Sequence, residues 1–309
     1  MKIVTLTLNP AFDVHCYTRE FQPYHENLAQ ITANDAGGKG VNISRALTVN
    51  GVDNTALVVL GQENGESFRR ALDADGIPYC EISVAGRIRE NITLHTENAP
   101  ETRISFAGFT ANDELIDRAE EQLNQLLNTG DILTFTGRNP EGISMARVKA
   151  MLKNLQGRGV KIVLDSRSFD KQDMIDVAPW LIKPNEEEIG MYVDMEVQDF
   201  KDAKLAAELL RSKGIENVMI SLGAKGAMLC GAEGCFVAHA PKINALSTIG
   251  AGDSSIGGFC AAAKAGMSPS EMLRYSVAYG SAACMTAGTQ PPRAEDVQAL
   301  LPTVTVETL

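Results

Sequence analysis

Short apolar runs alternate with helical patterns along most of the chain, and this alternation limits the fold more than any other feature. The apolar runs are bounded by turn residues and lie at 2–8, 55–60, 132–135, 160–164, 180–182 and 218–221. The helical patterns lie at 113–127, 144–155, 199–212, 251–265 and 269–287. Strands joined by helices form right-handed βαβ units, which place parallel strands in one sheet covered on both faces. The sequence therefore predicts an α/β fold with a doubly wound, mostly parallel sheet.

Two regions, 14–32 and 79–106, break this alternation. They contain short segments of alternating polar and apolar residues without a strong helical pattern, for example at 91–96. Such segments predict antiparallel strands that form a small second sheet. Because no repeat or linker divides the chain, residues 1–309 are predicted to form a single domain.

The charge balance excludes some classes of partner. A formal net charge of −11 argues against binding to nucleic acid or to an anionic membrane. The chain shows no signal peptide and no apolar run of about 18 residues, so a cytoplasmic protein is expected.

The cysteines and histidines predict no metal site. The six cysteines, none in a CxxC pair, are expected to be reduced and mostly structural: Cys16, Cys80, Cys230, Cys235, Cys260 and Cys284. Cys230 and Cys235 bracket a predicted hairpin turn. The four histidines lie far apart in the sequence, which suggests neither a zinc site nor a histidine-based triad.

A glycine turn at residues 247–255, Ser-Thr-Ile-Gly-Ala-Gly-Asp-Ser-Ser, leads directly into a helical run of small residues. Such a turn leaves the N–H groups of Gly250, Ala251 and Gly252 unpaired at the positive end of the helix dipole, where anions bind. A carboxylate at Asp253 would repel a bound phosphate unless it accepts the proton of an attacking hydroxyl in phosphoryl transfer. The alternative is an ordinary glycine turn in which Asp253 only starts the helix.

A second glycine cluster at residues 36–42, Ala-Gly-Gly-Lys-Gly-Val-Asn, also opens a helical pattern, with Val41, Ala46, Leu47 and Val49 predicted to face inward. It matches neither a Walker A loop nor GxGxxG, which argues against a nicotinamide-dependent oxidoreductase. Two further motifs complete a fixed order along the chain. They are Thr-Leu-Asn-Pro-Ala-Phe-Asp at 7–13 and Lys-Pro-Asn-Glu-Glu-Glu at 183–188.

These four motifs, in this order, resemble those of the PfkB (ribokinase-like) carbohydrate kinases, and the resemblance runs from Ile3 to about Ala287. The chain is most similar to their phosphosugar branch. The resemblance implies a phosphotransferase that uses ATP and Mg²⁺ to phosphorylate an alcohol group of a ketohexose monophosphate, most closely fructose 1-phosphate. Phosphorylation of tagatose 6-phosphate or fructose 6-phosphate is an alternative within the family. A non-catalytic sugar-phosphate-binding regulator is an alternative of another class.

The resemblance assigns the nucleotide end of the site. It implies a catalytic role for Asp253 with Gly250, Ala251 and Gly252. Mg²⁺ and its waters would be organised by Asn185 and Glu188, and oxygen ligands with retained waters suit this ion. The residues implied to hold ATP are Lys183, Asn185, Ser221, Gly223 and Gly226. A helix start at Asn185 and a simple hairpin turn at 221–226 are the structural alternatives.

The resemblance also assigns the sugar end. Asp13, Gly37, Gly38 and Asn42 are implied to contact the sugar, and Lys39 either approaches a phosphate or is solvated. The lid segments, at about 12–35 and 87–107, are implied to cover the sugar and to form a homodimer contact. Arg89 and Asn91 begin a lid strand, and a guanidinium binds phosphate bidentately. The resemblance associates an arginine at position 103 with the 6-phosphofructokinase type. The alternative is that Arg103 is a solvated surface residue.

Arg138 is the clearest departure from the family pattern. Residues 136–140 read Thr-Gly-Arg-Asn-Pro, where relatives usually have Ser-Gly-Ser-Leu-Pro. The segment follows a predicted strand and is therefore expected to face the ligand crevice. Arg138 either supplies a further phosphate contact or obstructs the usual sugar, and this leaves the identity of the substrate open.

Overall fold

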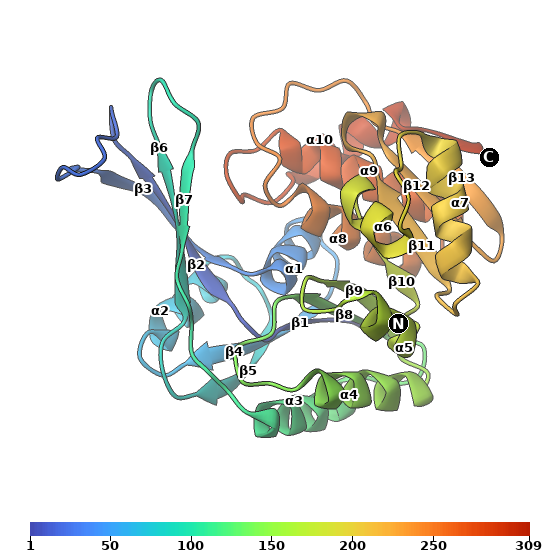
Figure 1. Cartoon of the computed structure of the whole chain (residues 1–309), viewed down its shortest axis with the longest axis horizontal. Coiled ribbons are helices and arrows are strands. Elements are labelled where there is room, and N and C mark those ends of the chain that lie inside the picture. The colour runs from blue at the N-terminus through green and yellow to red at the C-terminus, as the bar shows by residue number, and fades with distance from the viewer.

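The computed structural model describes residues 1–309 and contains a ten-stranded sheet as its main body (Figure 1). Its strands are β1 (Ile3–Thr7), β4 (Thr55–Gly61), β5 (Tyr79–Val84), β8 (Ile132–Gly137), β9 (Lys161–Ser166), β10 (Leu181–Ile182), β11 (Asn217–Ser221), β12 (Ala227–Gly231), β13 (Gly234–His239) and β14 (Thr305–Thr308). They lie in the order β14-β13-β12-β11-β10-β9-β8-β1-β4-β5. All pairings from β5 to β11 are parallel, and those from β11 to β14 are antiparallel. The predicted doubly wound sheet is confirmed.

Helices cover both faces of this sheet. They are α1 (Lys39–Val49), α2 (Gly65–Ala74), α3 (Asp113–Leu126), α4 (Met145–Gly157), α5 (Lys171–Val177), α6 (Glu186–Val193), α7 (Phe200–Arg211), α8 (Ala251–Lys264), α9 (Pro269–Cys284) and α10 (Ala294–Leu300), with short 3₁₀ turns η1 (Gly223–Lys225) and η2 (Leu301–Thr303). A core of 39 buried residues joins one face of the sheet to α3–α7, and a core of 23 joins the other face to α1, α8, α9 and α10. Alternation along β1 sends Val4 and Leu6 into the first core and Ile3 into the second.

Helix α1 follows the predicted pattern except at its end. Val41, Ala46 and Leu47 are fully buried, whereas Val49 is 42% exposed. Val49 is the last helical residue, and the chain turns away at Asn50. The inward position predicted for Val49 was therefore wrong.

A four-stranded second sheet, the lid, stands away from the main body at the upper left of Figure 1. It consists of β2 (Ala11–Tyr17), β3 (Gln30–Gly37), β6 (Arg89–His95) and β7 (Thr102–Ser105), in the order β3-β2-β6-β7. The β2–β3 and β6–β7 pairings are antiparallel as predicted, but the central β2–β6 pairing is parallel. Both central strands begin beside one another, at Ala11 and Arg89, and run outward together. Residues 79–84, predicted as part of the small sheet, instead form the edge strand β5 of the large one.

The lid presents one apolar and one polar face. Phe12 and Val14 pack with α2 in a third core of 11 buried residues. Because side chains alternate along a strand, Asp13 and His15 face the other way. The register pairs Asp13 with Asn91 and His15 with Thr93, so the polar side chains of β2 and β6 share one face. This face carries the residues that the sequence assigned to the sugar.

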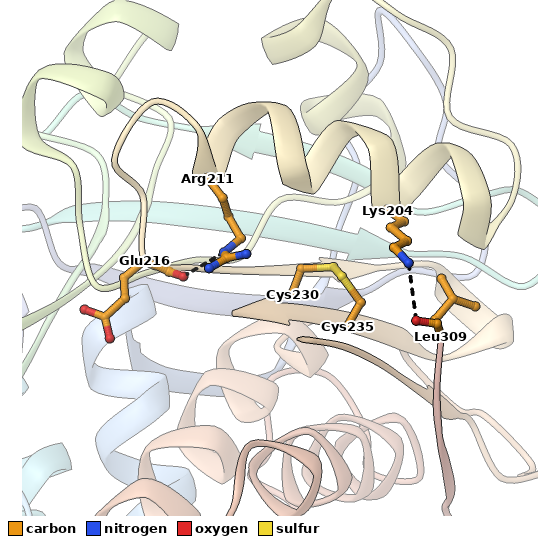
Figure 2. Close-up of a disulfide and its surroundings, with 6 residues drawn as sticks. All are labelled: Lys204, Arg211, Glu216, Cys230, Cys235 and Leu309. Atoms are coloured by element: carbon orange, nitrogen blue, oxygen red, sulfur yellow. Dashed lines mark hydrogen bonds between the residues drawn. A yellow bond between two sulfur atoms is a disulfide. The ribbon is translucent and has the colours of Figure 1, made fainter. Parts of the chain in front are cut away.

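The expectation of reduced thiols was wrong for one pair of cysteines. Cys230 and Cys235 lie directly opposite each other on the β12–β13 hairpin, with a Cα–Cα distance of 4.1 Å, and form a disulfide. Figure 2 shows this bond beneath α7, whose Lys204 and Arg211 donate hydrogen bonds to the carbonyl oxygens of Leu309 and Glu216. The sequence located the hairpin turn but not its register, which decides whether two cysteines face each other. The remaining four cysteines are free.

Two histidines that are distant in sequence meet in the lid. Nδ1 of His15 lies 3.0 Å from Nε2 of His95, and the two rings stack. The parallel β2–β6 pairing brings them together, which sequence separation could not reveal. No group of three or more metal-binding side chains is present, and none of the helices has the length and apolar character needed to cross a membrane.

Candidate active site

The glycine turn before α8 forms an unpaired helix N-terminus. Gly250 has φ +79°, a conformation that glycine adopts readily, and no side chain caps the helix. The N–H of Ala251 donates to Thr248 O at 3.4 Å, whereas the N–H groups of Gly250 and Gly252 donate to no acceptor within the chain. The prediction of an unpaired N–H is therefore wrong for Ala251, whereas Gly250 and Gly252 present the unpaired N–H groups that bind an anion at a helix N-terminus.

Asp253 lies buried in the first turn of α8 and is only 7% exposed. Its Oδ2 accepts a 2.9 Å hydrogen bond from Nδ2 of Asn42 in α1. Burial raises the pKa of Asp253 to about 6, although the charge of Lys39 and the Asn42 hydrogen bond oppose the rise. A base with a pKa just below neutral pH is ionised under working conditions and still accepts a proton effectively.

Lys39 is partly exposed, with 32% of its side chain accessible, and it belongs to a cluster of charges whose other members, Asp165 and Lys183, are largely buried. Its Nζ lies 2.9 Å from Oδ2 of Asp165, and Nζ of Lys183 lies 3.9 Å from the same oxygen. Burial alone would raise the pKa of Asp165, but Lys183 and Lys39 hold it below its usual value. Burial also opposes the charge on Lys39, yet Asp165 and then Asp253 raise its pKa. Two ammonium groups thus lie between the strand ends and Asp253.

Asp165 is a site residue that the sequence analysis missed. It is the penultimate residue of β9, and a carboxylate at the carboxyl end of a parallel strand faces the ligand crevice of such sheets. That position was the available signal. Lys183 reaches the same place, because a Cβ added at Gly252 would lie 3.1 Å from its Nζ. Lys183 therefore touches the glycine turn itself.

The 183–188 motif and the 221–226 turn lie side by side. They follow the neighbouring parallel strands β10 and β11, and Ser221 N donates to Pro184 O at 3.0 Å. Asn185 caps α6: its Oδ1 accepts from Glu188 N at 2.8 Å, and Glu188 Oε2 accepts from Asn185 N at 3.1 Å. The structural alternative for this motif is thus realised, and the other carboxylate oxygen of Glu188 lies 3.9 Å from Nε of the exposed Arg167.

The two glycines of the 221–226 turn differ in their surroundings. Both have positive φ, +54° at Gly223 and +112° at Gly226. A Cβ at Gly226 would collide with the carbonyl oxygen of Ala238, so packing against β13 already requires glycine there. A Cβ at Gly223 would meet nothing. Gly223 therefore lies on the open side of the turn.

The residues that the resemblance assigns to the sugar centre on Asp13. Its Oδ1 accepts a 2.9 Å hydrogen bond from Nδ2 of Asn91, and Oδ1 of Asn91 accepts one of 3.1 Å from Nη1 of Arg89. A Cβ at Gly37 would collide with the Asp13 carboxylate, and one at Gly38 would lie 2.9 Å from Thr7 Cγ2. The glycines thus let the start of α1 approach both β1 and Asp13. The predicted residues Asp13, Gly37, Gly38 and Asn91 are brought together.

The other two arginines predicted to bind substrate, Arg103 and Arg138, are both exposed. Arg103 is exposed on β7, opposite Thr93, which places it on the polar face of the lid. Arg138 is exposed in the loop that follows β8, next to the strand end of β1. Neither forms an ion pair.

The carboxylates beside Lys39 fit a Mg²⁺ ion that arrives with a nucleotide. The negative charges of Asp165 and Glu188 both raise the pKa of Lys39. Mg²⁺ is typically held by one or two carboxylates together with substrate phosphates and waters. Two carboxylates without a third protein ligand match that donor set rather than a permanent metal site.

The arrangement as a whole can perform phosphoryl transfer. A buried base, unpaired N–H groups and two ammonium groups converge at one point, and hydrogen-bonding groups for a polar acceptor extend from it along the lid. Phosphoryl transfer depends on positioning and charge stabilisation of this kind.

Comparisons with known proteins agree with this geometry. A model described as "pfkB family carbohydrate kinase" matches residues 7–296. The 1-phosphofructokinase of Vibrio cholerae is 32% identical over 287 residues, covering 93% of this chain and 90% of the relative. The 1-phosphofructokinase of Escherichia coli K12 is 33% identical, covering 83% of this chain and 82% of its own length.

A solved structure is similar over the same extent. Phosphofructokinase-2 from Escherichia coli in complex with fructose-6-phosphate superposes with a TM-score of 0.91 at 27% identity, covering 98% of each chain. The family model spans most of this chain, and the motifs that carry the resemblance lie within the matched residues. This chain belongs to the pfkB family of carbohydrate kinases.

Proposed function

We propose that this protein transfers the γ-phosphoryl group of ATP to the free primary hydroxyl of a ketohexose monophosphate, with fructose 1-phosphate as substrate and fructose 1,6-bisphosphate as product. The observation that carries the proposal is Asp253, buried beside an unpaired helix N-terminus with a pKa of about 6. The relatives named 1-phosphofructokinase support the choice of substrate. One domain would carry the whole reaction, in the cytoplasm, where ATP is available.

The geometry supports an in-line displacement with Asp253 as general base. The Asp253 carboxylate takes the proton of the acceptor hydroxyl while the hydroxyl oxygen bonds to the γ-phosphorus, and the bond from phosphorus to the β–γ bridging oxygen breaks to release ADP. The unpaired N–H groups of Gly250 and Gly252 stabilise the charge on the transferring group. Lys39 and Lys183 add positive charge at the same point.

The nucleotide would lie along the carboxyl ends of β10 and β11. Lys183, Asn185, Ser221, Gly223 and Gly226 border this stretch and would contact the phosphates and ribose. Glu188 and Asn185 would hold Mg²⁺ partly through water, together with Asp165. A bound Mg²⁺ ion would neutralise part of the negative charge of the ATP phosphates.

The acceptor would extend from Asp253 to the lid. From the reacting hydroxyl outward, the acceptor would contact Asn42, Gly37, Gly38 and Asp13. Its far end would contact Arg89 and Asn91. A ketohexose carrying phosphate on one terminal carbon has its free primary hydroxyl at the other, which matches this separation of base and arginine.

The lid also offers a surface for a second copy of the chain. Exposed apolar side chains gather on its outer parts: Tyr17, Phe21, Tyr24, Leu28, Ile31, Ile104 and Phe106. Exposed apolar side chains that are numerous in one part of a protein favour an interaction site there. A homodimer through the lid is therefore part of the proposal, and sedimentation of Tyr24→Asp and Ile31→Asp variants tests it.

One observation favours a second acceptor, fructose 6-phosphate. Arg103 lies on the polar face of the lid, and the resemblance associates an arginine at this place with the 6-phosphofructokinase type. A panel assay of ATP consumption with fructose 1-phosphate, fructose 6-phosphate and tagatose 6-phosphate separates these substrates. Turnover of none of them, with intact binding, would make the protein a sugar-phosphate-binding regulator.

A further inference from the structure

Three arginines stand apart from all the others in the chain. Of the 15 arginines in the sequence, twelve form an ion pair or a hydrogen bond to a backbone carbonyl. Arg103 and Arg138 form neither, and Arg89 bonds only to the neutral amide oxygen of Asn91. In a protein with 39 acidic residues, unpaired guanidinium groups indicate positions kept free for an anion from outside.

Arg89 and Arg138 belong to different elements, and the backbone segments that carry them both lie beside Asn9. A Cβ at Gly108 would lie 3.3 Å from both Arg89 Cβ and Asn9 Oδ1, so the Asn9 side chain lies against the start of β6. On its other side, Asn9 Nδ2 donates to Asn139 O at 3.4 Å, in the residue after Arg138. Burial lowers the pKa of Arg89, the negative charge of Asp13 opposes this, and the positive charge of Arg138 adds to the lowering. The charges of Arg89 and Arg138 therefore act on each other.

Buried polar atoms at this place also lack partners. Arg89 Nε and Asn9 Oδ1 are both inaccessible and form no hydrogen bond. A buried donor without an acceptor costs free energy of about 1–3 kcal/mol. A phosphate between the two arginines would supply the acceptor that Arg89 Nε lacks.

The loop that carries Arg138 is fixed on both sides of this residue. Ser166 Oγ donates to Gly137 O at 2.6 Å, and Asn139 N donates to Ser168 Oγ at 2.9 Å. The Arg138 side chain itself is exposed and bonds to nothing. Because the backbone on both sides is already fixed, binding of an anion by the free guanidinium would require little further ordering of the loop.

We infer that Arg138 and Arg89 together bind the phosphate group of the acceptor, and that Arg138 thereby sets how strongly the protein prefers a phosphorylated ketohexose. The inference rests on the proposed function, because it gives the phosphate of the proposed acceptor a second guanidinium beside that of Arg89. The phosphate lies at the lid end of the site, away from Asp253.

Calorimetric binding of fructose 1-phosphate, fructose 6-phosphate and tagatose 6-phosphate in the absence of ATP tests this inference. The variants are Arg138→Lys, Arg138→Ser and Arg138→Glu, with Arg87→Ser as the matched control. Arg87 is also an exposed arginine near the lid, but Glu90 already pairs with it at 2.6 Å. For the best of the three ligands, affinity should fall in the order Arg, Lys, Ser, Glu, with Ser about 10-fold weaker than wild type. Arg87→Ser should stay within about 2-fold.

Unchanged or tighter binding by Arg138→Ser and Arg138→Glu would overturn the inference and show that Arg138 points to solvent or obstructs the sugar. An equal loss in all three variants, without dependence on charge, would also overturn it, because it would indicate a role in loop structure. The proposed function is judged separately, by turnover of the wild-type protein with ATP. If the affinities of the wild type and the variants follow the predicted order but the wild-type protein does not turn over, the proposed function is refuted and the phosphate site is retained.

Discussion

The side-chain amide of Asn42 donates a 2.9 Å hydrogen bond to the carboxylate of Asp253, although 211 residues separate them in the sequence. Asn42 lies in the first turn of α1 and Asp253 in the first turn of α8. The two helices pack closely, since a Cβ at Gly257 would lie 3.6 Å from Ala46 Cβ. Both glycine motifs of the sequence therefore meet at one carboxylate.

The pH dependence of the reaction should follow the ionisation of Asp253. Its pKa of about 6 lies above the ordinary value, and only the ionised form accepts a proton. We expect kcat/KM to be half-maximal at a pH of about 6 and to fall about tenfold per pH unit below it. A profile that stays flat down to about pH 5 would contradict this assignment.

Replacing Asn42 should move that profile. The Asn42 hydrogen bond lowers the pKa of Asp253, so Asn42→Ala should shift the acid limb to higher pH and slow the reaction at pH 7 more than at pH 8.5. Asn50→Ala, at the other end of α1, is the control, because Asn50 bonds only to backbone carbonyls. A uniform loss at every pH would indicate that Asn42 acts only by holding substrate.

Arg89→Ala should raise the KM for the ketohexose phosphate far more than the KM for ATP. A charge-assisted contact to phosphate stabilises binding by roughly 1.5–3 kcal/mol, or about 10- to 100-fold. Steady-state kinetics with each substrate varied in turn measures both constants. Equal effects on the two substrates would remove Arg89 from the sugar end of the site.

The disulfide should matter for stability and not for catalysis. Cys230 and Cys235 lie on the β12–β13 hairpin, at the end of the large sheet opposite to the lid. Because the closed loop is short, a Cys230→Ser, Cys235→Ser double variant should lose about 2 kcal/mol of unfolding free energy without reductant and keep kcat/KM within about 2-fold. Denaturant unfolding with and without reductant checks this, with Cys80→Ser as the control for a free thiol. Loss of activity in the double variant would show that the hairpin communicates with the site.

Features encoded locally could be predicted from the sequence. The turn at Gly250 and the buried strands such as β1 follow from short patterns, because a glycine with positive φ and an apolar run each specify their own backbone. The sharing of a face by Arg89 and Asn91 follows from the two-residue period of a strand. These parts of the fold and of the candidate site needed no knowledge of tertiary contacts.

Features that depend on pairing between distant segments could not be predicted. The parallel β2–β6 register brings His15 to His95, and Lys39 at the start of α1 lies 2.9 Å from Asp165 near the end of β9, but neither contact leaves a local signature. Arg45 is a further example: it is 5% exposed, pairs with Asp75 at 2.8 Å and donates to Asn42 Oδ1 at 3.4 Å. Nothing in its sequence surroundings distinguishes it from a surface arginine.

The most direct measurement of the central claim is the kcat of Asp253→Asn on the best ketohexose phosphate, together with calorimetric binding of that substrate. The amide keeps the shape of the carboxylate but accepts no proton, so kcat should fall by about 10²–10⁴-fold while binding is kept. The variant should unfold at no lower a temperature than wild type at pH 8, because burial disfavours the ionised carboxylate that the variant lacks. A folded variant that retains more than about a tenth of the wild-type kcat would show that Asp253 is not the general base.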